Sequence, residues 1–407
     1  MKIRRFLTKL YYQILSRSFR LWFAFIQLFF RHPKSVLLWD PQADFPGDSP
    51  LERLRFFAPQ ALAIVLNPHS LGGVSNALWL MLWPNFILIS QIDRAWLRAV
   101  LKFRPLTFGV DPLRNPMDGW EWARLACAIE NINIRRDGQQ HQQKLAKLFA
   151  GWRKNLNLDR VYLFGTGPSL EKANERDWSD GYRVVCNTIV RDPELFHKLA
   201  PQIIVAGDGI YHFGHTDFAK AFRSDLKKRL SESECIFLFP RLFLPVVQRE
   251  LGEFSDRLFP VPVAESQSVH HGLDQNYFLP ALGNALALLL LPVGCTFSKN
   301  VCLWGFDGRA PDDKLFWSNS VRHSYPELMS GLLTNHPIFF DHHVPKTDPF
   351  KYMRNTLGDE LEQAFLAAER AGWKFSMLHQ SWTPSLARRK VTEPTKSEQS
   401  ANRAASK

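Results

Sequence analysis

Short apolar runs alternate with amphipathic stretches along the chain from about residue 160. The runs have the length of buried strands, whereas the stretches between them repeat apolar positions at helical spacing. Strands that alternate with helices are typical of a mostly parallel sheet, so we expect an α/β fold with a doubly wound sheet. The predicted strands are Val161–Phe164, Arg183–Cys186, Gln202–Ala206, Cys235–Phe239 and Asn300–Trp304, and the predicted helices are Pro168–Glu175, Asp192–Leu199, Asp217–Leu230, Leu244–Leu251 and Leu279–Leu291.

The first 34 residues have a different pattern. Apolar side chains recur at helical spacing from Ile3 to Ile14, and the run from Leu21 to Phe30 is apolar except for Gln27. Ten helical residues rise about 15 Å, roughly half the hydrocarbon thickness of a bilayer, so this run is too short to span. Because the segment also carries eight basic residues and no acid, it is expected to lie on an anionic membrane surface. The alternative is a helix packed on the protein's own core.

The segments on either side of the predicted sheet are less informative. Residues 35–155 are expected to form a mostly helical N-terminal region, which together with residues 1–34 makes a membrane-associating layer. Its apolar run from Ala77 to Ile89 is interrupted by Pro84 and is interpreted as a buried hairpin, with a membrane interface as the alternative. Residues 383–407 are expected to be a disordered basic tail.

Composition and charge narrow the class of protein. Hydrophobic residues make up 45% of the 407 residues and charged residues 22%, which is typical of a globular protein. The net charge of +12 resides on residues 1–34 and on the tail, which leaves residues 35–382 neutral. A nucleic-acid-binding domain carries its positive charge on the folded body, so we expect no nucleic-acid partner. The five cysteines show no C-x-x-C spacing, which argues against a structural metal site.

The loop after the first predicted strand has the strongest chemical signal. Two glycines allow close approach of a ligand to the backbone, and a proline suits the first position of a helix. The exposed amides at that helix start, with a serine hydroxyl, would suit a phosphate. The loop lacks the third glycine of a dinucleotide fingerprint and the Gly-Lys-Ser/Thr of a P-loop. Its residues are Gly165, Thr166, Gly167, Pro168 and Ser169.

Polar residues also follow three other predicted strands. Asn187 follows the second strand, Asp208 the third, and Gly305 and Asp307 the last. In a parallel sheet the carboxyl ends of the strands meet at one edge, where ligands bind. We therefore expect these residues to belong to one site.

These residues resemble a known family. The segments LFGTGPSL and VVCNTI, a long helix that ends in Gly-Cys, and the strand VCLWGFDG look like those of the bacterial sialyltransferases of the capsule and lipooligosaccharide type. The same signature occurs in a wider group that includes the archaeal 6-hydroxymethylpterin pyrophosphokinase-like proteins. The resemblance covers Val161 to Leu378 and implies that residues 156–382 form a Rossmann-like nucleotide-sugar-binding domain, a single GT-A-like unit.

The resemblance implies roles for several residues. In that family the glycine loop and the Cys-Asn motif hold a CMP-sugar, so the loop Gly165–Ser169 and Asn187 would line the nucleotide site, with Gly283 and Asn284 at the start of the long helix. The family has Asn where this chain has Thr166, and a Ser before Gly283. The tyrosine that stabilises phosphate in the family is missing after Asp307, and the charged or polar residues Arg309, Arg322 and Tyr325 would replace it.

The family's general base is a histidine in a loop before the final helix. Here that loop corresponds to His342 and His343, before a helix expected from about Gly358 to Ala371. A neutral histidine takes a proton from an acceptor hydroxyl, and we favour His343 for this role. His323 is the rival base. The histidine pair also has two other interpretations, as metal ligands or as an ordinary polar loop.

Taken with the resemblance, the sequence predicts a peripheral glycosyltransferase on the cytoplasmic face of the inner membrane. It would transfer a sugar from a nucleotide-sugar donor, CMP-linked in the related family, to a glycan or lipid-linked acceptor, with no cofactor. One alternative is a pyrophosphokinase-like phosphotransferase, in which Asp208 and Asp307 would hold Mg²⁺. The other alternative is a non-catalytic scaffold tethered to the membrane.

Overall fold

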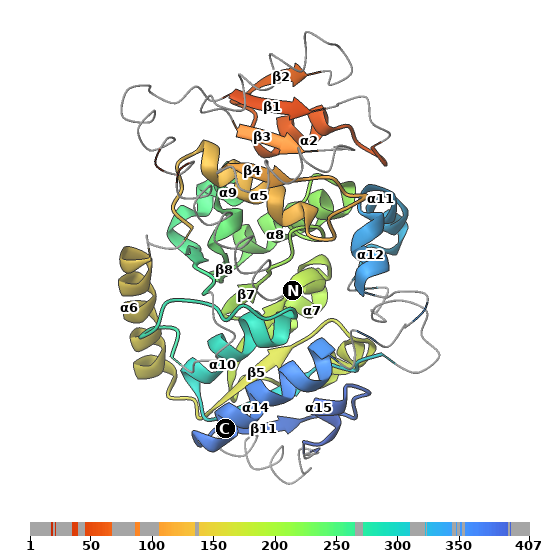
Figure 1. Cartoon of the computed structure of the whole chain (residues 1–407). Helices are drawn as coiled ribbons and strands as arrows, with labels where there is room; N and C mark the ends of the chain where they lie inside the picture. The colour runs from red at the N-terminus through yellow and green to blue at the C-terminus, as the bar shows by residue number, and fades with distance from the viewer. Residues whose placement is uncertain are drawn as a thin grey trace, which may run out of the picture. The chain divides into compact units, whose positions relative to one another are not determined.

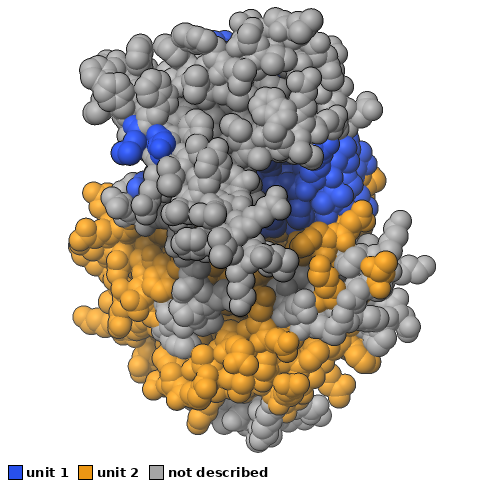
Figure 2. All heavy atoms as spheres, viewed as in Figure 1, with its two compact units in different colours: residues 1–133, 331–339 blue, residues 134–330, 340–407 orange. Residues whose placement is uncertain are grey.

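The chain forms two compact units, described from a computed structural model. The first unit is Met1–Asn133 with Gly331–Phe339, and the second is Ile134–Ser330 with Phe340–Lys407 (Figure 2). Most of residues 1–34, residues 67–85, His323 and residues 392–407 lie outside the described part, and so do the predictions made for them. The structure describes residues 18, 21, 35–39, 45–66, 86–89, 106–134, 138–264, 272–309, 322, 324–343, 347, 351, 355–389 and 391.

The second unit is built on a seven-stranded sheet in which every described pair of neighbouring strands is parallel (Figure 1). The strand order is β11-β10-β5-β6-β7-β8-β9. The chain therefore moves from β5 outward to β9, and then returns to the other side of β5 to form β10 and β11. The strands are β5 (Arg160–Phe164), β6 (Tyr182–Cys186), β7 (Ile203–Val205), β8 (Ile236–Pro240), β9 (Leu258–Val261), β10 (Asn300–Trp304) and β11 (Lys374–Met377).

Helices cover the sheet of the second unit. Three of them bury apolar side chains in one continuous core with Val161, Val184 and Leu238 of the strands. These are α6 (Gln139–Leu156), α14 (Leu361–Arg370) and the π-helix η5 (Leu286–Leu290), which continues into α10 (Leu291–Phe297). Because crossovers are right-handed, the connections between β5 and β9 lie on the opposite face. They contain the 3-10 helices η1 (Pro168–Glu175) and η2 (Asn187–Arg191) and the α-helices α7 (Pro193–Leu199), α8 (Asp217–Glu232) and α9 (Leu244–Leu251).

The predicted α/β class is confirmed for the second unit, and all five predicted strands occur. Strands β9 and β11 were not predicted. β9 is an edge strand that contains Pro260, and proline is tolerated within edge strands but disfavoured in the middle of central strands. β11, at the other edge, alternates apolar residues with Lys374 and Ser376, so it forms no apolar run.

One predicted helix is displaced. The sequence predicts Leu279–Leu291, whereas the helix begins at Leu286 and ends at Phe297. The Asn284 side chain accepts a hydrogen bond from the Ala287 amide at 2.8 Å and caps this helix. Asparagine at such a position is a common start signal, which the apolar periodicity of the segment conceals.

In the first unit the described residues include a parallel sheet that the prediction of a mostly helical region does not contain. The sheet has the strand order β2-β1-β3-β4, and the helices α2 (Pro50–Phe57) and α5 (Asp118–Ile129) belong to the same unit. Apolar runs of three to five residues cannot be assigned to strand or helix by periodicity alone. The strands are β1 (Ser35–Trp39), β2 (Leu62–Leu66), β3 (Phe86–Ile89) and β4 (Thr107–Gly109).

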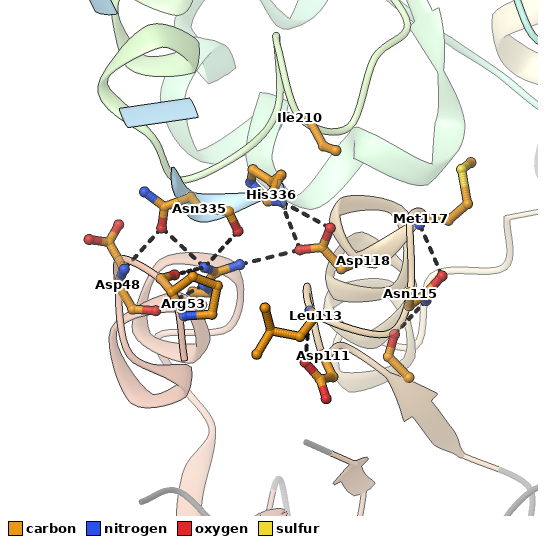
Figure 3. A network of polar contacts seen from close by, with 12 residues as sticks. Asp48, Arg53, Asp111, Leu113, Asn115, Met117, Asp118, Ile210, Asn335 and His336 are labelled. Atoms are coloured by element: carbon orange, nitrogen blue, oxygen red, sulfur yellow. Dashed lines mark hydrogen bonds and ion pairs between the residues drawn. The ribbon is translucent and has the colours of Figure 1, made fainter. Parts of the chain in front are cut away.

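A buried ionic network holds the segment Gly331–Phe339 in the first unit (Figure 3). Arg53 is fully buried and donates to the Asp118 carboxylate at 3.2 Å and to both the backbone and side-chain oxygens of Asn335 at 3.0 Å. Nδ1 of His336 lies 2.9 Å from the same carboxylate. A buried charge is tolerated only when it is paired in this way, so the network fixes the end of α11 (Met329–Asn335) against α2 and α5.

The folded part of the chain continues beyond residue 382, where the prediction places the start of a disordered tail. Pro384–Ala387 form the short helix α15, and Arg389 is buried. Arg389 donates to Glu362 at 2.8 Å and to Glu369 at 3.0 Å, which both belong to α14. Within the part of the chain that the structure describes, no helix is long and apolar enough to cross a bilayer.

Candidate functional site

The two central loops of the second unit meet where the strand order reverses. β5 and β10 are neighbours, although the chain leaves them in opposite directions across the sheet. The Gly165 amide donates to the Trp304 carbonyl, and the Gly167 amide donates to the Gly305 carbonyl, both at 2.8 Å. In open α/β sheets the ligand crevice lies at this kind of reversal, outside the carboxyl ends of the strands.

Glycine is required at three positions because the loops approach each other so closely. A Cβ on Gly165 would lie 2.5 Å from the Gly305 carbonyl oxygen and 2.8 Å from the Phe306 ring. A Cβ on Gly167 would overlap the Asp307 carboxylate, and Gly305 adopts a φ of +79°, which favours glycine. The predicted glycine motif therefore allows the β5 loop to pack closely on the β10 loop.

Asp307 occupies the anion position at the start of η1. Its two carboxylate oxygens lie 3.1 and 3.2 Å from the Ser169 amide nitrogen, which donates to them, and the Ser169 hydroxyl donates to Asp307 at 2.8 Å. The sequence predicts that this amide and hydroxyl bind a phosphate. In the structure the carboxylate of Asp307 takes that place, so a second anion at the same point would be repelled.

His379 belongs to the site and was not predicted. Its Nε2 accepts from the amides of Gly305 at 3.0 Å and Phe306 at 3.3 Å. Because Nε2 is an acceptor, the proton of the neutral ring lies on Nδ1, which donates to the Gln380 carbonyl at 2.7 Å. His379 follows β11, the edge strand that the sequence pattern does not reveal. Its hydrogen bonds to the Gly305 and Phe306 amides fix the β10 loop.

Asn187 has an unsatisfied side-chain oxygen at this edge of the sheet. It follows β6, next to β5, and has a φ of +52°, in the left-handed region. Its Oδ1 is buried and has no hydrogen-bond partner within the described part of the chain. Buried polar atoms nearly always have partners, and strained backbone clusters at functional sites, so these two observations together indicate a ligand-binding residue.

Asp208 is held in a turn of its own after β7. Its Oδ1 accepts from the amides of Ile210 and Tyr211 at 2.7 Å, and its own amide donates to Nδ1 of His212 at 3.1 Å. Complete burial and the Arg223 cation lower the pKa of His212 to about 3, so this ring is neutral. Asp208 thus shapes the loop after β7.

Asp208 and Asp307 follow strands that lie three strand spacings apart in the sheet. They follow β7 and β10, and β5 and β6 lie between. Strands are spaced about 4.8 Å apart, which places the two strand ends roughly 14 Å from each other. One Mg²⁺ needs ligands at about 2.1 Å, so the spacing of the strands alone does not bring these two carboxylates together. In the described residues, no three metal-ligating side chains cluster.

Two of the three residues predicted to stabilise phosphate contact α7 and α8. Arg322 pairs with Asp192 at 2.9 Å and Glu194 at 3.2 Å, at the start of α7. The buried Tyr325 donates to Asp225 of α8 at 2.8 Å. Arg309 is buried close to the β10 loop. Arg322 and Tyr325 therefore anchor their segment to α7 and α8.

The candidate bases His342 and His343 are the last two residues of α12 (Pro337–His343), so they lie in a helix instead of the predicted loop. Phe340 in the same helix packs on Tyr211 at 6.2 Å between ring centroids, which places it beside the loop after β7. Desolvation, His342 and Lys351 lower the pKa of His343 to about 4. The ring contact of Phe340 therefore places the end of α12 beside the loop after β7.

Gly283 and Asn284 precede η5 at the same edge, because η5 and α10 lead back to the start of β10. The Asn284 side chain is buried and its Oδ1 is engaged in capping the helix. Its observed role is thus to begin the helix.

Comparison of the chain with protein-family models, with curated proteins and with solved structures gave no match. The function must therefore follow from the geometry of the site itself.

Proposed function

We propose that the chain is a membrane-associated glycosyltransferase whose Rossmann-like second unit binds a nucleotide-activated sugar at the meeting point of the β5 and β10 loops. The observation that carries this proposal is the buried Oδ1 of Asn187, which has no hydrogen-bond partner among the described residues and lies one strand away from that point. A left-handed asparagine with a free acceptor indicates a ligand that donates a hydrogen bond.

The polarity of the edge supports a nucleoside more than a bare phosphate. Asp307 supplies a carboxylate between the two loops, and Asn187 supplies an amide oxygen. Acceptors of this kind suit donors such as ribose hydroxyls or the exocyclic amino group of cytosine. The phosphate of the donor would then lie away from the Ser169 amide, which Asp307 already occupies.

The transfer step needs a base that is neutral at physiological pH. His343 meets this condition, because its pKa of about 4 keeps the imidazole unprotonated. In the proposed reaction its imidazole takes the proton from the acceptor hydroxyl as that oxygen bonds to the anomeric carbon of the sugar, and the bond from that carbon to the nucleotide phosphate breaks, which releases the nucleotide. No step of this scheme calls for a metal ion.

The acceptor is proposed to be a glycan or lipid-linked molecule at the cytoplasmic face of the inner membrane. Residues 1–34, with eight basic side chains and no acid, would hold the enzyme on that anionic surface.

A ligand screen by thermal unfolding tests the proposal. The full chain is heated with CMP, CTP, UDP or ATP, each with and without Mg²⁺. Stabilisation by CMP or CTP without metal is expected, since binding to the folded state alone raises the melting temperature. Strictly Mg²⁺-dependent stabilisation by ATP would indicate the phosphotransferase instead, and no stabilisation by any nucleotide would indicate a scaffold.

Asn187→Gly makes this screen specific for the site. Glycine keeps the left-handed backbone and removes only the amide side chain. The variant should therefore keep its melting temperature without ligand and lose at least tenfold in nucleotide affinity. Unchanged affinity would show that the Asn187 oxygen does not contact the nucleotide.

A further inference from the structure

The start of α8 is a helix terminus whose side-chain cap is missing. The helix begins directly after Thr216, which has the extended backbone of an N-cap residue, with φ of −68° and ψ of 158°. A threonine at this position normally accepts a hydrogen bond from one of the first amides of the helix. The Thr216 side chain accepts no such bond.

The Thr216 hydroxyl is also buried without a partner. The residue is 4% exposed, and its Oγ1 forms no hydrogen bond in the part of the chain that the structure describes. The ladder of α8 starts with the Lys220 amide, which donates to the Thr216 carbonyl at 3.0 Å. The amides before it have no acceptor inside the helix, although Phe218 and Ala219 are buried. A buried hydroxyl that stays unsatisfied beside such amides indicates an external group.

Ring contacts connect this helix start to the helix that begins at Asn187. Phe218, in the first turn of α8, packs on Tyr325 at 5.1 Å between ring centroids. The Arg191 guanidinium lies 4.7 Å from the centroid of the same tyrosine ring. Arg191 is the last residue of η2, whose first residue is Asn187, and α8 also packs on η2.

A second set of ring contacts connects the helix start to α12. Phe218 packs on Tyr211, in the loop after β7, at 5.3 Å between ring centroids. Tyr211 in turn packs on Phe340 of α12, the helix that ends at His343. The start of α8 therefore belongs to the same edge of the sheet as the proposed nucleoside site and the proposed base.

We propose that the Thr216 hydroxyl and the first amides of α8 form a subsite for a phosphate group. All of these groups donate hydrogen bonds, and the dipole of a 16-residue helix favours negative charge at this end. The subsite deepens the proposed function, because Asp307 excludes the donor phosphate from the Ser169 amide. Only the identity of the ligand that carries the phosphate rests on that function.

Thermal unfolding of the full chain with inorganic phosphate or CMP, against sodium chloride at equal ionic strength, tests the subsite. Inorganic phosphate should raise the melting temperature of the wild-type protein. Thr216→Val should lose this shift without melting lower in the absence of phosphate, because it removes a buried hydroxyl that has no partner. A Thr216-dependent shift with CMP as well would assign the subsite to a nucleotide, and a shift with inorganic phosphate alone to another phosphate carrier.

Thr216→Asp tests whether the amides are available to an anion. Aspartate is a preferred N-cap residue, so its carboxylate should accept from the first amides and take the place of the phosphate. The variant should melt higher than wild type without phosphate and show no phosphate shift. Asp217, the acid in the first turn of α8, is exposed. Asp217→Asn should bind phosphate more tightly, since it removes a like charge beside the subsite.

Thr296→Val is the matched control. The buried Thr296 hydroxyl accepts from the Leu273 amide at 3.0 Å and donates to the Pro292 carbonyl at 2.7 Å. Its removal should lower the melting temperature and leave the phosphate shift intact. Phosphorus NMR line broadening of inorganic phosphate by wild type and Thr216→Val provides a readout that does not depend on stability.

Two results would overturn the subsite: no phosphate shift in the wild type at matched ionic strength, or an equal shift in Thr216→Val. These results are separable from failure of the proposed function. If no nucleotide stabilises the chain while the phosphate shift depends on Thr216, the subsite stands and the nucleotide proposal falls. If nucleotides bind and phosphate produces no Thr216-dependent shift, the reverse holds.

Discussion

His212, a buried side chain in the loop after β7, makes the stability of the protein depend on pH. Its ring accepts a hydrogen bond from the Asp208 amide, and its pKa is about 3. The unfolded chain takes up a proton below about pH 6.5, whereas the folded chain does not until about pH 3. The stability that this residue contributes is therefore complete above pH 6.5 and is lost as the pH falls toward 3.

His212→Asn should weaken this pH dependence. The asparagine Oδ1 can replace Nδ1 as acceptor for the Asp208 amide but does not titrate. Between pH 6.5 and 4.5, the free energy of unfolding of the wild type should fall more steeply than that of the variant, by about 1.4 kcal/mol per pH unit. Denaturant titrations at pH 7, 6 and 5 measure both slopes, and carboxylates contribute equally to each. Parallel slopes would mean that His212 is protonated in the folded state.

His343 provides a residue-scale test of the proposed chemistry. The base must be unprotonated, so activity is expected above its pKa and should be lost only as the pH falls through about 4. The acidic limb of kcat/KM should therefore lie well below the range of an ordinary histidine. His343→Ala should lower kcat by about 10²–10⁴-fold with donor affinity nearly unchanged, and His342→Ala is the matched control. An acidic limb near pH 6.5 that persists in His343→Ala would assign the base elsewhere.

Residue-scale predictions from sequence succeed only where the signal is local. The glycines of the β5 loop are correctly placed at a strand end, but the partner of the Ser169 amide, Asp307, is 138 residues away in sequence. No spacing rule connects those two positions. His379 is missed because the edge strand before it alternates polar and apolar residues.

At the scale of elements, the β5 and β10 loops act as one unit tied by Asp307. The carboxylate accepts from the Ser169 amide and hydroxyl, and the Asp307 carbonyl accepts from the Trp382 amide at 2.6 Å. Glycines on both loops allow this approach. The segment after β11 therefore fixes the β10 loop, and the β10 loop fixes the start of η1.

Asp307→Ala should destabilise the protein by about 1–2 kcal/mol, because it leaves the Ser169 amide and hydroxyl without their acceptor. Asp177→Ala is a suitable control, since Asp177 accepts from the Ser179 amide at 2.9 Å in an exposed turn and should cost less. Denaturant unfolding measures both differences. A variant as stable as wild type would show that the two loops hold together without the carboxylate.

Burial explains which elements could be predicted. Strands β5, β6, β7 and β8 are covered on both faces and form apolar runs that periodicity detects. Edge strand β9 contains a proline, and the short strands of the first unit resemble buried helix in periodicity, so the sequence predicts neither.

At the scale of the whole chain, the net positive charge and most helices and strands of the two compact units are carried by different parts of the sequence. The excess of positive charge lies at the two ends of the sequence, and residues 35–382 are neutral. The joining of Gly331–Phe339 to the first unit depends on Arg53, which donates to Asn335 across 282 residues. Such a contact is beyond any local sequence pattern.

Deletion of residues 1–34 should release the protein from membranes. Each basic residue near an anionic surface contributes about 1 kcal/mol, and the segment has eight. Co-sedimentation with vesicles that contain anionic lipid should show binding of the full chain, weakened by high salt, and little binding to neutral vesicles. Equal binding of the shortened chain would assign the attachment to another segment, such as the apolar run at residues 77–89.

Hydrogen exchange of the full chain, with and without saturating CMP or CTP, tests most directly whether the ligand binds where the β5 and β10 loops meet. Bound nucleotide should slow amide exchange in peptides that contain Gly165–Ser169, Asn187 and Gly305–Asp307, because these loops line the proposed site. Peptides from α2 and α5 of the first unit serve as the internal reference. Protection confined to other segments, or unchanged exchange at all three loops, would contradict the assignment.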